Sequence, residues 1–311
     1  MAELRTNQPG TTAAEKPIIV LAGSTGDLGR LIAKYLLARG AVVRALVRKG
    51  NTKPEVQALR ELGASVVEVD FNSVIELTQV CAGAVCVVSA LSGLRDVIFD
   101  TQKRLLDAAV VAGVPRFIPS DYSIDYTKLA NGSNRNLDLR REFNQRLDQA
   151  PITATSVLNG MFTDLLTGQA PVVLFSLKRV MYYGDADQPM DFTTTDNTAE
   201  FTAAAALDPT TPRYLRVAGE VATIRGVQKA ASEATGQQFG LLRVGGVWVL
   251  GAMIKATKAL MPPSDDVFPP WQGMQYMHNM FTGLPKLQPL DNARYPDIRW
   301  TPIREVLATR K

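Results

Sequence analysis

Short apolar runs alternate with amphipathic stretches along the first half of the chain. The apolar runs have strand length, and they predict strands over Ile18–Ala22, Val42–Val47, Ser65–Val69, Ala84–Val88 and Arg116–Pro119. Between them, apolar residues that recur every three or four positions predict helices over Leu28–Arg39, Lys53–Leu62, Val74–Val80 and Leu94–Ala112. Because strands and helices alternate, we expect an α/β fold with a doubly wound parallel sheet and helices on both faces. Ligands of such folds bind at the carboxyl ends of the strands.

The alternation becomes looser in the second half. After a polar connection over residues 120–136, a helix over Leu137–Gln149 and a strand over Thr153–Leu158 are expected. Further strands are predicted over Val172–Phe175 and Tyr214–Val217, and helices over Thr198–Leu207, Ile224–Thr235 and Val247–Met261. We therefore expect a disordered tail over residues 1–16, a first domain over 17–160, and a smaller α+β lobe over 161–311 that is interleaved with it.

Composition excludes few classes of protein. The chain has 311 residues, 46% of them hydrophobic and 21% charged, which is typical of soluble enzymes. Its net charge of +4 is too small to indicate nucleic-acid binding. The apolar stretch Val244–Met261 is interrupted by Lys255 and Lys258, so no membrane span is expected. Two neighbouring cysteines, Cys81 and Cys86, do not indicate a disulfide framework, and a reducing cytoplasmic location is expected.

The glycines at 23, 26 and 29 give the first chemical signal. They follow the apolar run that ends at Ala22, and a helix pattern begins directly after them, so the order is strand, turn, helix. Dinucleotide-binding turns need glycine for a tight exit from the strand, for approach to a pyrophosphate, and for close helix packing. The alternative is a structural turn without a ligand. We expect Gly23, Ser24, Thr25, Gly26, Asp27, Leu28 and Gly29 to contact the cofactor.

The end of the second strand indicates which dinucleotide binds. In NAD-binding folds a carboxylate stands there and binds the ribose 2′-hydroxyl, whereas this chain has Arg48 and Lys49. A guanidinium can bind a 2′-phosphate, so NADP(H) is favoured, unless the two residues are only a solvated charge pair. Asp70 and Phe71 follow the third strand and Ser89, Ala90 and Leu91 follow the fourth, so both groups are expected to contact the cofactor. Asp70 could equally cap the next helix.

Several segments resemble a known family. From Gly23–Gly29 through Ala109–Ser120 (AVVAGVPRFIPS) to Asp291–Pro296, the chain resembles the NmrA-like and isoflavone-reductase-like branch of atypical short-chain dehydrogenases. The resemblance covers almost the whole chain after the tail. It implies a Rossmann domain that binds NADPH, with a C-terminal substrate lobe, and it adds Ser120, Gly160 and Phe162 to the cofactor contacts. It also implies either reduction of phenolic or other aromatic substrates, or redox sensing without turnover.

The resemblance also implies a lysine on the helix after the Pro-Ser segment, and the chain departs from the family here. The expected position falls at Arg140, and no lysine occurs between Lys128 and Lys178. A guanidinium stays protonated, so Arg140 could bind phosphate, ribose or a substrate anion but would be a poor proton shuttle. The alternative is that Arg140 is a surface charge on an amphipathic helix.

Other candidates for proton transfer are Tyr122, at the mouth of the fifth strand, and Lys128 in the same loop. Tyr122 could donate a proton to a carbonyl, or it could only pack over the nicotinamide. His278, the single histidine, stands in a Met- and aromatic-rich run typical of core or pocket wall, and no metal site is expected.

Two functions are therefore open. The first is an NADPH-dependent oxidoreductase that transfers hydride to a small aromatic or phenolic substrate. The second is a non-catalytic NADP(H)-binding redox sensor with a protein partner, which Arg140 suggests. Neither a nucleic-acid nor a membrane partner is expected, and a homodimer stays open.

Overall fold

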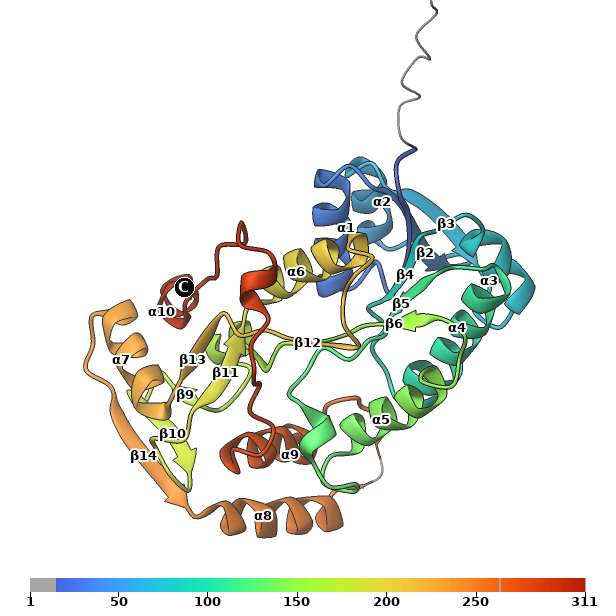
Figure 1. The fold of residues 1–311 in the computed structure, drawn as a ribbon. Coiled ribbons are helices and arrows are strands. Elements are labelled where there is room, and N and C mark those ends of the chain that lie inside the picture. Colours follow the sequence, from blue (N-terminus) through green and yellow to red (C-terminus); the bar gives the residue numbers. More distant parts are fainter. Residues whose placement is uncertain (1–14, 263, 311) are drawn as a thin grey trace, which may run out of the picture.

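The computed structural model describes residues 15–262 and 264–310. Its larger sheet has six parallel strands in the order β3-β2-β1-β4-β5-β6, which is doubly wound (Figure 1). These strands are β1 (Ile18–Ala22), β2 (Val42–Arg48), β3 (Ser65–Val69), β4 (Cys86–Ser89), β5 (Arg116–Ile118) and β6 (Thr153–Ala154). The strand order reverses between β1 and β4, and ligands of such sheets bind at the carboxyl ends of the strands at this point.

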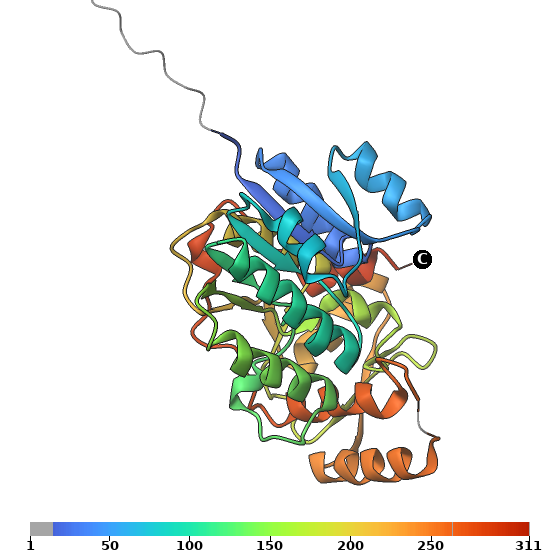
Figure 2. The same ribbon diagram turned by 90° about the vertical axis from the view of Figure 1, so that its right-hand side faces the viewer.

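Helices cover both faces of this sheet. Residues Ile19 and Leu21 of β1 pack against α1 (Asp27–Ala38) and α6 (Thr195–Leu207). Val20 of the same strand faces the opposite side, because side chains alternate along a strand. That second face packs on α3 (Val74–Cys81), α4 (Gln102–Val111) and α5 (Arg135–Leu147), and Figure 2 views the molecule from this side. The shorter helix α2 (Pro54–Glu61) precedes β3. The expected doubly wound α/β sheet is therefore confirmed.

Two expected elements are divided in the structure. The stretch Leu94–Ala112 contains a π-helix over Asp96–Thr101 before α4 begins, so its first turns are wider than α-helical turns. The expected strand Thr153–Leu158 is split into β6 and β7 (Ser156–Leu158). β6 pairs with β5, whereas β7 pairs with β12 (Tyr214–Arg216), so the chain leaves the large sheet between them.

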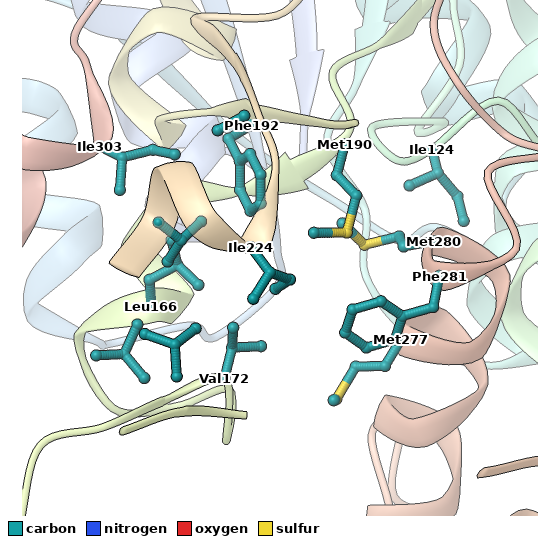
Figure 3. Packing of buried hydrophobic residues seen from close by; sticks show 14 of the residues in the cluster. Ile124, Leu166, Val172, Met190, Phe192, Ile224, Met277, Met280, Phe281 and Ile303 are labelled. Atoms are coloured by element: carbon teal, nitrogen blue, oxygen red, sulfur yellow. The ribbon is translucent and has the colours of Figure 1, made fainter. Parts of the chain in front are cut away.

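The second half adds two small sheets, β14-β10-β9 and β13-β11-β8. Their strands are β8 (Met161–Phe162), β9 (Val173–Leu174), β10 (Arg179–Tyr183), β11 (Met190–Thr193), β13 (Glu220–Ala222) and β14 (Gly240–Gly245). The remaining α-helices here are α7 (Ile224–Thr235), α8 (Val247–Leu260), α9 (Pro270–Phe281) and α10 (Ile303–Ala308). Short 3-10 turns lie at Tyr126–Lys128, Thr163–Thr167 and Asn292–Arg294. Figure 3 shows the apolar core of this lobe, where Met190, Phe192 and Ile224 meet Met280 and Phe281 of α9.

The two halves of the chain are interleaved through α6. This helix comes from the second half, yet it packs on α1 and on the large sheet (Figure 1). The buried guanidinium of Arg116 on β5 donates to the carbonyls of Ala205 (2.9 Å) and Ala206 (3.1 Å) in the last turn of α6. A cation at a helix C-terminus is favourable, so this contact fixes α6 to the sheet.

Two further expectations concern the tail and the membrane. Residues 1–14 of the expected tail lie outside the described residues. Among the described helices, none is long and apolar enough to cross a membrane, and α8 accounts for most of the apolar stretch noted in the sequence.

Candidate functional site

The three glycines of the turn differ in what the surrounding chain requires of them. Gly23 has a φ of +76°, and a Cβ there would lie 2.4 Å from the carbonyl oxygen of Ala90. A Cβ on Gly29 would lie 2.1 Å from the carbonyl oxygen of Gly23. At Gly26 the nearest atom would be 3.5 Å away, an ordinary contact. The packing of the protein therefore requires glycine at 23 and 29, whereas at 26 it leaves room for a Cβ.

Gly26 is also the N-cap of α1, and no side chain caps this helix. The first N–H groups of a helix lack intrahelical partners and attract anions. The other turn residues have separate roles: buried Ser24 donates to the Leu46 carbonyl (3.0 Å), Asp27 pairs with Arg30 (2.7 Å), and half-buried Leu28 packs against the core. Thr25 is half-buried. The turn thus offers backbone N–H groups, with few side chains, to a phosphate.

A cavity of about 310 Å³ opens at the carboxyl ends of β2 and β3. It brings together Arg48 and Phe71, two of the expected cofactor residues. Its other wall is formed by the π-helix and α4, and the charged residues of that wall are Asp96, Asp100 and Arg104. Sequence reasoning missed this wall, because no local pattern shows which helix faces the end of β2.

Lys49 and Asp70, which are also expected to contact the cofactor, make hydrogen bonds within the protein. The ammonium of Lys49 lies 2.6 Å from a carboxylate oxygen of Glu76, and this hydrogen bond raises the pKa of Lys49. Asp70 accepts from the N–H of Asn72 (2.9 Å) and so closes a turn. Ser73, not Asp70, is the N-cap of α3, so the alternative reading of Asp70 as that helix cap is wrong.

The ends of β4 and β5 are joined through Ser120. Its hydroxyl donates to the Leu91 carbonyl (2.6 Å), and its N–H donates to the side-chain oxygen of Gln102 (2.9 Å). Its carbonyl accepts from Nε of Arg140 (3.0 Å). Ala90 lies directly against Gly23, and the buried hydroxyl of Ser89 makes no hydrogen bond among the described residues. These contacts place Ala90, Leu91 and Ser120, three of the expected cofactor residues, next to the glycine turn.

Arg140 is therefore more than a solvated charge. It is half-buried on α5, and it also donates through Nη1 to the carbonyl of Asn136 (3.0 Å). Tyr276 of α9 lies nearby: burial raises the pKa of its phenol, while the charges of Arg140 and Arg135 and the Asn136 side chain lower it. In the sequence this tyrosine is only part of the Met- and aromatic-rich run around His278, which is typical of core or pocket wall.

The interpretation of Tyr122 as a proton donor conflicts with the structure. Its side chain belongs to the core cluster on the α1 and α6 face, with Phe201 and Cys86. Its hydroxyl is fully covered, with the side chain of Thr202 on α6 as its polar neighbour. Burial raises the pKa of this phenol well above its ordinary value. Tyr122 thus packs in the core on the α1 and α6 face of the sheet.

Lys128 and His278 also make contacts that occupy them. The ammonium of Lys128 donates to the carbonyl of Lys286 (2.5 Å) and lies 3.6 Å from a carboxylate oxygen of Asp125. The imidazole of His278 lies beside α8, where a Cβ on Gly251 would approach Nε2 to 3.5 Å. In the described part of the chain, no cluster of metal-ligating side chains occurs.

The remaining expected contacts lie where the second half begins. Gly160 has a φ of +71°, and a Cβ there would lie 2.3 Å from the carbonyl oxygen of Asp191, so packing alone requires this glycine. Phe162 is half-buried beside the core. Asn159, which precedes Gly160, is fully buried, and its side-chain amide has no hydrogen-bond partner in the described residues. A polar residue directly after a strand was the signal that could have identified it.

Comparison with known proteins gives consistent matches. The model of the NmrA-like family matches residues 15–262. Pinoresinol reductase 2 of Arabidopsis thaliana is 31% identical over 215 residues, which cover 65% of this chain and 68% of that protein. Pinoresinol reductase 1 of the same plant is 30% identical, covering 63% and 67%. The isoflavone reductase homolog IRL of Zea mays is 28% identical, covering 63% of this chain and 66% of its own length.

Solved structures share the fold. AtPrR2 with NADP+ and (+)pinoresinol has a TM-score of 0.80 at 24% identity, over 95% of this chain and 99% of that one. An isoflavone reductase has a TM-score of 0.78 at 19% identity, over 94% of this chain and 99% of that one. The binary complex of leucoanthocyanidin reductase and NADPH from Vitis vinifera has a TM-score of 0.78 at 18% identity, over 93% of this chain and 98% of that one.

Proposed function

The chain belongs to the NmrA-like family, and from this premise we propose that it is an NADPH-dependent reductase of a small phenolic substrate. The observation that carries the proposal is the turn at Gly26, where no side chain caps the first N–H groups of α1, together with the cavity at the ends of β2 and β3 that Arg48 lines. The reductases among its relatives, and the NADP(H) complexes among structures of the same fold, support both the cofactor and the substrate class.

The residues fit this cofactor at each end. We assign the pyrophosphate to the turn Gly23–Gly29, the adenosine end to Arg48 and Phe71, and the nicotinamide end to the loops after β4, β5 and β7. Ser89 ends β4 and Asn159 follows β7, and the polar side chains of both are fully buried without a hydrogen-bond partner among the described residues. When bound, NADPH supplies the hydride. Arg140 holds the carbonyl of Ser120 and supplies a fixed positive charge at the mouth of β5.

The substrate would lie against the second lobe. We propose Phe162, Met161 and the apolar face of α9 as the wall, because pockets for small molecules are mostly apolar with few polar groups. The phenol of Tyr276, beside Arg140, is then one of the few polar groups in that wall.

Two measurements test the proposal. Titration followed by nicotinamide fluorescence should give a clearly lower dissociation constant for NADPH than for NADH, and equal affinities would contradict the assignment of Arg48. NADPH absorbance should then fall when pinoresinol-type lignans, phenolic ethers or quinones are added.

One observation favours a second function, a non-catalytic NADP(H)-binding redox sensor. Arg140 occupies the position of the expected lysine, and a guanidinium cannot release a proton at accessible pH. If the wild type oxidises NADPH with no member of the panel, while Arg140→Lys does so, the sensor is the better description. Turnover by the wild type would exclude it.

A further inference from the structure

The cavity at the ends of β2 and β3 contains a second arginine to which the proposed function gives no role. Arg104 lies on α4, far from Arg48 in the sequence, yet both line the same cavity. We propose that Arg104 is a second cationic contact for the 2′-phosphate of NADP(H) and thus a determinant of the preference over NAD(H). This inference rests on the proposed function and names a further residue of the same site.

The guanidinium of Arg104 is available for such a contact. Nearby cations are paired: Lys49 with Glu76 (2.6 Å), Arg95 with Glu142, and the neighbouring Lys103 with Asp107 (2.5 Å). Among the described residues, Arg48 and Arg104 form neither an ion pair nor a side-chain hydrogen bond. Asp100 stands one turn before Arg104, a spacing that often gives an ion pair, but the two side chains, which both line the cavity, form none.

The charge balance of the cavity explains why Arg104 matters. Its charged lining residues are Arg48 and Arg104 against Asp96 and Asp100. With Arg48 alone, the two carboxylates would leave a net negative lining, which repels a 2′-phosphate and instead suits the 2′-hydroxyl of NAD. Arg104 offsets the second carboxylate. Two guanidiniums can then share the phosphate oxygens through charge-assisted hydrogen bonds.

The experiment compares two fragments that differ only in the phosphate at issue. Adenosine 2′,5′-bisphosphate and adenosine 5′-monophosphate are titrated calorimetrically into the full chain, and NADPH and NADH are titrated alongside. Arg104→Gln should lower the affinity for the bisphosphate and for NADPH by about ten- to a hundredfold. Its affinity for the monophosphate and for NADH should stay nearly unchanged. Lys103→Gln is the matched control, because it removes the same charge from the adjacent position outside the cavity. Its affinities should stay within about twofold of wild type.

The outcomes separate the two proposals. If the wild type binds both fragments equally, the assignment of NADP(H) itself fails. If the wild type prefers the bisphosphate and Arg104→Gln keeps that preference, only the role of Arg104 is overturned. Equal weakening of all four ligands would also overturn it, since this would show that Arg104 packs on the adenine. Arg104→Lys should retain part of the preference, and thermal melts of each variant would show that the fold is intact.

Discussion

The glycines of the nucleotide turn differ in how much room a Cβ would have. Substitution at Gly29 should therefore lower stability, whereas substitution at Gly26 should lower the affinity for NADPH. Gly29→Ala would place a Cβ 2.1 Å from the Gly23 carbonyl oxygen, so we expect the unfolding free energy to fall by about 1–3 kcal/mol. Gly26→Ala meets no close contact, so its stability should change by less than about 1 kcal/mol. Its affinity for NADPH should nevertheless fall by about tenfold or more, because the new methyl group stands where the pyrophosphate approaches.

Urea unfolding and NADPH titration of the two variants measure these effects. Normal NADPH affinity in a folded Gly26→Ala protein would contradict the assignment of the turn as a phosphate site. A Gly29→Ala protein as stable as wild type would mean that α1 can shift away from β1.

His278 should make stability depend on pH. Burial lowers the pKa of this imidazole below its ordinary value of 6.5. At higher pH the histidine is neutral in both states. As pH falls through about 6.5, the unfolded chain takes up a proton that the folded chain resists, so stability is lost in that direction.

Since this is the single histidine of the chain, His278→Gln isolates its contribution. From about pH 7.5 to about pH 5.5, the unfolding free energy of the wild type should fall more than that of the variant. Equal losses would show that the imidazole is protonated as easily in the folded protein as in the unfolded chain.

At the scale of elements, α8 is held by few of its side chains. Leu250 is its one buried residue, whereas Trp248 is 77% exposed although it is the larger side chain. Leu250→Ala should therefore lower the unfolding free energy by about 2–5 kcal/mol. Trp248→Ser should change it by no more than about 0.5 kcal/mol. Urea unfolding of both variants tests this, and the reverse ranking would mean that α8 packs through its other face.

The elements also show how far sequence reasoning reaches. The strands and helices around the glycine turn follow local periodicity, and Arg48 follows from its place at the end of β2. Tyr122 could not be placed, because only packing against α6 decides to which side of the sheet its ring turns. The wall with Arg104 depends on how the π-helix orients α4, and no residue spacing encodes that. The short strand β11 was missed because Asp191 interrupts its apolar positions.

For the whole molecule, α6 sets the order in which the core can be completed. All six strands of the large sheet are encoded by residue 154, but α6 begins only at Thr195. A nascent chain leaving the ribosome at roughly 5–20 residues per second therefore carries one sheet face without its full cover for a time on the order of seconds. Arg116 has no α6 carbonyls to bind during this interval. We therefore expect the growing chain to be exposed to aggregation between the synthesis of β6 and that of α6.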